Sequence, residues 1–233
     1  MKIEQNCNIS LPQSACVLGN TAGILSTTIW FTVLVPQLVR NHQRQSVEGL
    51  NVMWAIANFS ASLCHVFFAF QQQIPIQIKI QAVYMPCLEF FMLLQFWFYW
   101  NIHNKQTVRQ EPNTLVLILR SKHILAAICV PVWLAIILVQ IIFDNSSSYF
   151  EWCAVVLWSI ETFPQLWTNM TDTGRSVSGQ SVVSILITIA GKTTDSLATY
   201  LLVMPVQYKV LAFFSSTSAW LNAFMVMVLY RRG

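Results

Sequence analysis

The chain has 233 residues, of which 55% are hydrophobic and only 9% are charged, against about 25% charged residues in a typical soluble domain. So few charges cannot cover a water-soluble globule of this size, and a mean hydropathy of +0.55 indicates that lipid solvates the excess apolar side chains. The net charge of +4 is small and its bases are dispersed between apolar runs, which argues against a nucleic-acid partner.

Seven apolar stretches approach or exceed the roughly 20 residues that a helix needs to cross the hydrocarbon core. In chain order, the predicted spans cover residues 16–39, 52–70, 76–100, 123–143, 150–170, 178–203 and 206–230. An unpaired peptide group in lipid costs several kcal/mol, so each run must satisfy its own backbone, and long runs without alternation are helices. The predicted fold class is an all-α membrane protein with seven transmembrane helices.

The distribution of lysine and arginine predicts the orientation, because these residues are kept on the cytosolic side. Connections after odd-numbered spans, together with the C-terminus, hold nine bases: Arg40, Arg44, Lys105, Arg109, Arg120, Lys122, Arg175, Arg231 and Arg232. The opposite side holds three: Lys2, Lys79 and Lys209. We therefore expect an N-terminus outside or in a lumen and a cytosolic C-terminus. Short tails without an evident sorting signal favour a bacterial inner membrane, or a lysosomal or vacuolar membrane if the chain is eukaryotic.

An internal repeat divides the chain into two similar halves. Both copies contain Pro-Gln-Leu, then an asparagine, then Ser-Val-x-Gly. These motifs lie at 36–38, 41 and 46–49 in the first copy and at 164–166, 169 and 176–179 in the second. Three spans per copy and one linker span predict parallel repeats in a 3+1+3 arrangement, with substrate at their interface near the bilayer midplane. The predicted domains are a first repeat at 16–100, a cytosolic loop and linker helix at 101–148, and a second repeat at 149–230.

The Pro-Gln pair of each copy is predicted to act as a hinge. Proline lacks an amide hydrogen and clashes with the carbonyl four residues before it, so Pro36 and Pro164 should kink their helices and free those carbonyls. Gln37 and Gln165 can donate and accept hydrogen bonds at once, so they can hold a kinked backbone or a moving neighbour. Prolines are also commoner in membrane helices generally, but a matched pair followed by the same turn favours the hinge.

Pro-Gln-Leu with the downstream asparagine and Ser-x-x-Gly, present twice in a seven-span chain, resembles the PQ-loop transporters over nearly the whole chain. That family includes cystinosin, the cationic amino acid exporters of lysosomes and vacuoles and, more distantly, the SWEET sugar carriers. SVEGLNVMW at 46–54, Cys64-His65 and QQIPIQIKIQAVY at 72–84 look closest to the cationic amino acid branch. The resemblance implies export of lysine- or arginine-like substrates from an acidic compartment, often with proton coupling.

Two places depart from that branch. Ser-Ala-Ser stands at 60–62, where an aspartate is usual in the second span, and Lys192 follows Gly191, where an asparagine is usual.

Among the ionisable side chains inside predicted spans, four stand out: Glu89, Glu161, Lys192 and Asp195. Each costs at least about 2.5 kcal/mol at bilayer depth, so we expect them to face a cavity or a partner. Glu161 lies one turn before Pro164 and could meet substrate or carry a proton. Glu89 lies midway along the third span, where a buried carboxyl could exchange protons near neutrality.

Lys192 and Asp195 are three residues apart, a spacing that permits a structural ion pair. The alternative is that they grip a zwitterion, with Lys192 taking its carboxylate and Asp195 its ammonium group. If all four groups are ionised, two net negative charges remain, which is compatible with a cationic solute or with proton binding.

Polar and aromatic side chains in the spans supply further candidates: Trp54, Asn58, His65 and Asn222. Asn58 and Asn222 would seek hydrogen bonds in a pore, since an amide in mid-membrane needs a partner. Trp54 could stack on a substrate. Helix packing or interface anchoring is the competing interpretation for each, and for Trp54 and His65 it is favoured.

The sequence therefore predicts a secondary transporter of a small polar solute, most simply a cationic or zwitterionic amino acid, that works by alternating access about the two Pro-Gln pairs. A SWEET-like sugar or metabolite facilitator and a seven-helix ligand receptor without flux are the alternatives. No nucleotide-binding or metalloprotease motif is present, so we expect neither ATP dependence nor an enzyme, and no cofactor or metal. The expected partners are the lipid bilayer, the solute and, with coupling, protons; the sequence does not determine an oligomeric state.

Overall fold

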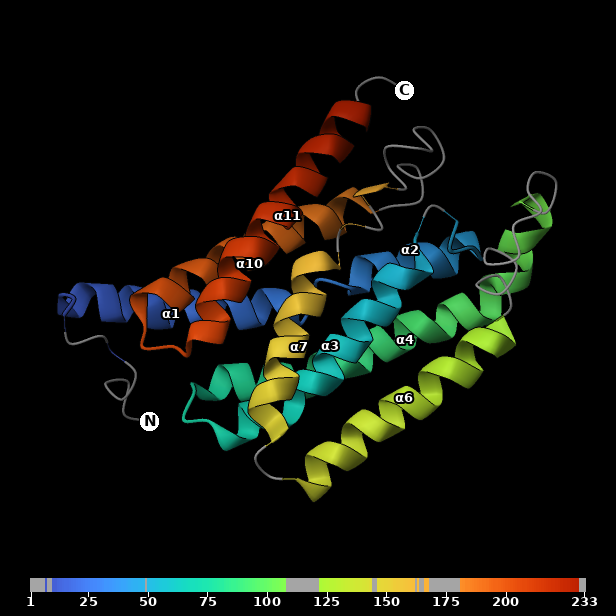
Figure 1. Ribbon diagram of the computed structural model, residues 1–233. Helices are drawn as coiled ribbons and strands as arrows, with labels where there is room; N and C mark the ends of the chain where they lie inside the picture. Colours follow the sequence, from blue (N-terminus) through green and yellow to red (C-terminus); the bar gives the residue numbers. More distant parts are fainter. Residues whose placement is uncertain are drawn as a thin grey trace.

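The computed structural model describes residues 7, 10–48, 50–107, 122–143, 146–161, 163, 166–167 and 181–230. Within these residues the chain is helical, with no β-strand apart from an isolated bridge between Cys7 and Leu202 (Figure 1). The helices are α1 (Gln13–Trp30), α2 (Val35–Arg44), α3 (Val52–Gln71), α4 (Ile76–Thr107), α6 (Lys122–Ile142), α7 (Ser147–Ile160), α10 (Val182–Leu201) and α11 (Val206–Tyr230).

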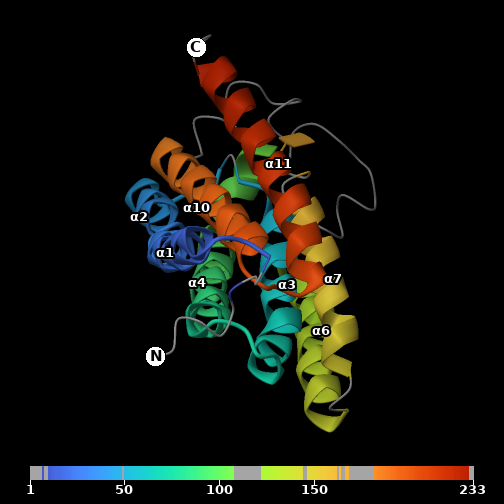
Figure 2. The same ribbon diagram turned by 90° about the vertical axis from the view of Figure 1, so that its left-hand side faces the viewer.

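The helices of the two halves of the chain pack against each other in a matching pattern. α1 runs along α10, and α7 runs along α3, so the first helix of each half contacts the middle helix of the other. Within each half, the third helix contacts the first two: α4 lies against α1 and α3, and α11 lies against α7 and α10. α6 contacts α3 from the edge of the bundle (Figure 2).

Small residues on α1 let it approach α10 closely, as a spacing of four between Gly19 and Gly23 predicts. A Cβ atom on Gly19 would lie 3.0 Å from the Cβ atom of Leu201, which is fixed to the α10 backbone. On the facing helix, a Cβ atom on Gly191 would lie 3.2 Å from the ring of Trp30. The α1–α10 contact therefore depends on residues that have no side chain.

Five segments are long and apolar enough to cross a membrane: 13–44, 52–71, 76–99, 123–142 and 206–228. They correspond to five of the seven predicted spans. The other two predicted spans coincide with α7, which has 14 residues, and α10, whose 20 residues include a lysine, an aspartate and several hydroxyl groups. The bundle is thus all-helical with five candidate spans among the described residues, and seven crossings stay a prediction.

The structure revises the prediction of a kink at Pro36. α1 ends at Trp30, four residues form turns, and Pro36 lies in the first turn of a separate helix, α2, where its missing amide hydrogen is not needed. The carbonyl of Thr32, which proline was expected to free, accepts a hydrogen bond from the amide of Val35 at 3.1 Å. The chain therefore has a helix break with a satisfied carbonyl instead of a kink. Pro164 and Gln165 lie outside the described residues.

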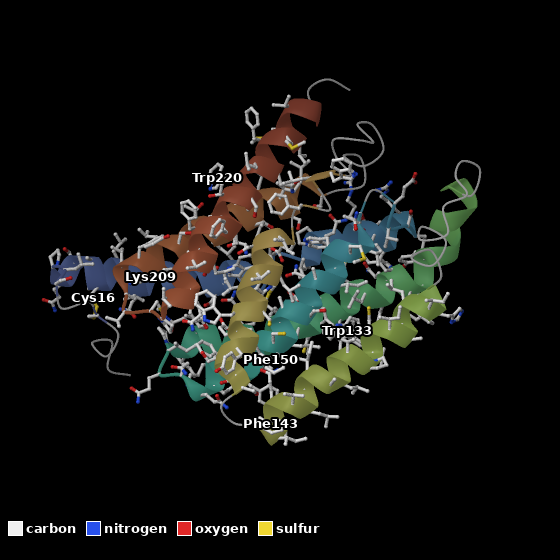
Figure 3. All side chains as sticks on the ribbon, viewed as in Figure 1. Cys16, Trp133, Phe143, Phe150, Lys209 and Trp220 are labelled. Carbon is white, nitrogen blue, oxygen red and sulfur yellow. A yellow bond between two sulfur atoms is a disulfide. The ribbon has the colours of Figure 1, made fainter. Side chains whose placement is uncertain are left out.

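The cysteines and outer aromatic residues complete the description. Cys7 and Cys16 form a disulfide that sequence spacing did not indicate, whereas Cys64 is a buried free thiol. Apolar side chains cover the outside of the bundle, as lipid contact requires, and Figure 3 shows Trp220 on the outward side of α11 and Phe143 beside the end of α6. The hydrophobic surface therefore faces outward, and the polar groups described next face inward.

Candidate functional site

A cavity of about 210 Å³ lies inside the bundle, between helices of both halves of the chain. It is lined by all the side chains predicted to bind substrate or protons, and also by one hinge glutamine and the lesser candidate histidine: Glu89, Glu161, Lys192, Asp195, Asn58, Trp54, Asn222, Gln37 and His65. Ionisable groups collect here because placing them against acyl chains would leave their charge unsolvated. A space of this size admits a small solute and excludes a macromolecule.

Asp195 is held by two donors from α1. Its carboxylate accepts a hydrogen bond from Trp30 Nε1 at 2.7 Å on one oxygen and a short hydrogen bond from Ser26 Oγ on the other. Tryptophan is enriched at membrane–water interfaces, but the Trp30 side chain is buried in the cavity wall. This indole N–H reaches the carboxylate because Gly191, one turn away on α10, allows the ring to lie close.

The ion pair predicted between Lys192 and Asp195 is replaced by a contact between helices. Lys192 Nζ lies 3.8 Å from Glu161 Oε1, at the C-terminal end of α7, and 5.2 Å from the centroid of the Trp30 ring. A spacing of three on one helix permits a pair, but Asp195 already has its two donors on α1. The ammonium group therefore bridges the two halves through Glu161 and rests over an aromatic face, a favourable cation–π geometry.

Two carboxylate oxygens in this cavity are left for a further partner. Glu89 is buried, with 3% of its surface exposed, and its Oε2 atom has no hydrogen-bond partner among the described residues. Glu161 Oε2 is also unsatisfied within the described part of the chain. Buried polar atoms normally find a partner, so these oxygens are candidate acceptors for a donor such as a solute or water.

The amide and aromatic candidates occupy different parts of the wall. Asn58 accepts a hydrogen bond from Trp158 Nε1 at 3.1 Å, which ties α3 to α7. Trp54 is half-buried and packs against an apolar cluster, so packing describes it better than stacking on a solute. Asn222 is half-buried on α11 and lines the cavity.

A second polar pair, between His65 of the cavity wall and the buried Glu151, was missed by sequence reasoning. His65 Nδ1 lies 2.8 Å from Glu151 Oε2, joining α3 to α7, and Glu151 is fully buried. Glu151 falls two residues inside the predicted fifth span, where a carboxylate suggests the headgroup region. The sequence contains both residues, an acid at the start of the fifth span and a histidine in the second span. Only the packing of α3 against α7 shows that they are partners.

Gln37 joins three helices at the α2 end of the cavity. Its Oε1 atom accepts a hydrogen bond from the backbone amide of Ser181 at 2.7 Å, and its Nε2 atom donates to Asn41 Oδ1 at 2.8 Å. Asn41 in turn donates to Gln95 Oε1 on α4 at 2.9 Å. The glutamine of the first Pro-Gln pair therefore fixes α2 against α4 and the start of α10. This observation covers one of the two predicted hinge glutamines, because Gln165 is outside the described residues.

Apolar clusters flank the cavity at both ends. The cluster at the α2 end contains Trp30, Val33, Leu34, Val47, Leu50, Ala55, Leu88, Met92 and Phe96. The cluster at the opposite end contains Phe68, Ala69, Ile74, Ala82, Leu202, Met204 and Tyr208. Some members of each cluster also line the cavity, so the polar chamber is bounded on two sides by close-packed hydrophobic side chains.

Comparison with known proteins finds a family match in the N-terminal part of this chain. Residues 18–78 match the family model described as the PQ loop repeat. This segment holds α2 with its Pro-Gln pair, most of α1 and all of α3.

Two fungal proteins are similar to parts of the chain. The vacuolar histidine transporter YPQ3 of Saccharomyces cerevisiae is 30% identical over 94 residues, which is 40% of this chain and 31% of the relative. The uncharacterized protein C2E12.03c of Schizosaccharomyces pombe is 29% identical over 76 residues, which is 33% of this chain and 27% of the relative. The matches span less than a third of each relative, and neither supports a bacterial membrane.

Proposed function

We propose that this protein is a secondary transporter that moves amino acids, cationic or zwitterionic, across its membrane by alternating access. The observation that carries the proposal is the cavity between the two halves of the bundle, lined by three carboxyl groups and one ammonium group. A solute without charge would need none of these groups, whereas an amino acid presents charges of both signs. Similarity to a protein named as a histidine transporter is consistent with this substrate class.

The geometry suggests which group of an amino acid binds where. The carboxylate of the solute would bind Lys192, because the Lys192–Glu161 contact is long, at 3.8 Å, and a solute carboxylate could replace Glu161 there. The cationic group would take the unsatisfied oxygen of Glu89. Asp195 would then support the site by fixing Trp30, a change from the role of ammonium ligand that sequence reasoning gave it. A buried charge is tolerated when it is paired, so solute and site would neutralise each other.

The matching contacts of α1 with α10 and of α7 with α3 support two parallel three-helix repeats joined by α6, the proposed 3+1+3 arrangement. We assign residues 16–100 and 149–230 to these repeats. The apolar clusters at the two ends of the cavity are the candidate gates. The break between α1 and α2, with Gln37 bound to Ser181 on the other repeat, is the candidate hinge of the first repeat, and the Pro164–Gln165 pair is its counterpart in the second.

We further propose a vacuolar or lysosomal membrane, with the N-terminus in the lumen and the C-terminus in the cytosol. The distribution of lysine and arginine supports the orientation, and the name of one relative supports the compartment.

Counterflow in proteoliposomes tests the proposal. Vesicles are loaded with unlabelled arginine, histidine, cystine or glucose, and the same solute is added outside in labelled form. Label should accumulate for at least one amino acid and should not accumulate for glucose. Glu89→Gln should abolish accumulation of arginine, and Glu48→Gln, a carboxylate in the loop after α2, should leave it unchanged. Flux of glucose alone would identify a SWEET-like facilitator, and tight binding of a solute without any flux would identify a receptor.

A further inference from the structure

The His65–Glu151 pair lies apart from the proposed amino acid ligands and has no role in the binding scheme above. Glu151 has no exposed surface, and its second oxygen, Oε1, has no hydrogen-bond partner within the described residues. A lone buried carboxylate is unfavourable, so its partner has to supply charge or a hydrogen-bond donor. His65 is the residue in hydrogen-bond contact with it, at 2.8 Å. This pair also joins α3 to α7, which belong to different halves of the chain.

The two ring nitrogens of His65 face different surroundings. Nδ1 faces Glu151, and Nε2 lies 3.5 Å from the hydroxyl of Tyr208, which lines the cavity together with His65. The ring is further held by edge contacts with Trp158 and Tyr208, whose centroids lie 5.2 and 5.8 Å away. A proton can therefore reach Nε2 from the cavity, while Nδ1–H stays bound to the carboxylate.

Other titratable groups face the pair from neighbouring positions. Tyr208 lies on α11, Cys64 is adjacent to His65 on α3, and Cys153 is two residues from Glu151 on α7. Phenol and thiol groups ordinarily stay protonated below about pH 8, so they carry no charge across the range in which imidazole titrates. The other ionisable groups of the cavity are Glu89 on α4, Glu161 at the end of α7, and Lys192 and Asp195 on α10.

We propose that His65 and Glu151 form a proton-binding site on the cavity wall, and that a cationic solute in the cavity displaces its proton. Without the proton, neutral His65 donates Nδ1–H to the Glu151 carboxylate and accepts from the Tyr208 hydroxyl at Nε2, and the pair carries one negative charge. A proton from the cavity binds Nε2 and gives an imidazolium–carboxylate pair without net charge. A cation in the same low-dielectric cavity favours the negative state, so proton and cation compete.

The coupling to a solute depends on the proposed function, whereas the proton site itself does not. Arginine is the suitable probe because its own charge does not change in this pH range. Titration calorimetry of the purified protein with L-arginine, in two buffers of different ionisation enthalpy, gives the number of protons exchanged. We expect about one proton released per arginine at mildly acidic pH. At pH values at which the pair holds its proton, the affinity for arginine should fall up to about tenfold for each further unit of pH decrease.

Glu151→Gln should still bind arginine but release no proton and lose the pH dependence of affinity. Glu48→Gln, the matched carboxylate outside the cavity, should behave like the unmodified protein. Proton release that persists in Glu151→Gln, or that vanishes in Glu161→Gln instead, would overturn the assignment.

If arginine fails to bind the unmodified protein, transport of cationic amino acids is excluded, and the proton site is tested without solute. Infrared pH-difference spectra should contain an imidazolium signal that is absent from His65→Gln. In Glu151→Gln that signal should change, because the imidazolium no longer has a carboxylate partner. An imidazolium signal unchanged by Glu151→Gln would refute the pair as a proton-binding site.

Discussion

Replacing Trp30 with phenylalanine tests whether Asp195 is held in the site as a charged group. The change removes the indole N–H that lies 2.7 Å from the carboxylate but keeps an aromatic ring. A hydrogen bond to a charged acceptor contributes about 1.5–3 kcal/mol, against about 0.5–1.5 kcal/mol for a neutral pair. At about 2–4 °C per kcal/mol for a chain of this length, the lost hydrogen bond should lower Tm by about 3–12 °C.

Trp158→Phe is the matched control, since it removes an indole N–H that donates to the neutral amide of Asn58 at 3.1 Å. Thermal unfolding in detergent, followed by tryptophan fluorescence, should give a Tm loss from Trp30→Phe that exceeds the control by several degrees. Combining Trp30→Phe with Asp195→Asn completes a double-mutant cycle, which isolates this hydrogen bond from the effect of the smaller ring. Additive Tm changes in that cycle would refute a charge-assisted bond.

Three further outcomes are expected. Pro36→Ala restores an amide hydrogen that lets a continuous helix form across the break before α2, so arginine counterflow in proteoliposomes should slow severalfold, and unchanged flux would remove the hinge. Gln37→Leu leaves the Ser181 amide without its acceptor, which should destabilise the contact between α2 and the start of α10 by about 1–3 kcal/mol. A cysteine introduced into the cavity should then react faster with a water-soluble thiol reagent added from the α2 side. Gly19→Ala places a methyl group against the Cβ atom of Leu201, which cannot move without the α10 backbone, and should lower Tm by a few degrees. Gly23→Ala meets the flexible end of a glutamine side chain and should leave Tm nearly unchanged.

The location of the cavity charges could be predicted from sequence because lipid leaves them few alternatives. Glu89, Glu161, Lys192 and Asp195 all line the cavity, as expected for ionisable groups in apolar runs. Their partners could not be predicted in the same way. Lys192 has a neighbour within reach on its own helix, yet it contacts Glu161, because the partner of a side chain depends on how two helices cross.

The same limit applies to the features that sequence reasoning missed. Glu151 lies at the start of a predicted span, where a carboxylate fits the lipid headgroups, and Trp30 is of a residue type that is enriched at membrane interfaces. Each lies instead on a contact between the two halves, Trp30 against α10 and Glu151 against α3. Local patterns set which segments are apolar, but they carry no information on which helix faces which.

α6 contributes little to the core, since only 6% of its apolar window is buried within the protein. Its polar attachments to the bundle are the indole of Trp133 on Ser60 and the amide of Gln140 on a backbone carbonyl of α3. In the proposed arrangement α6 sets the orientation of the second repeat. Three crossings without this linker helix would leave the second repeat inverted relative to the first. A protein engineer could therefore rewrite nearly every outward position of this helix with other aliphatic residues, provided that these two anchors and its length were kept.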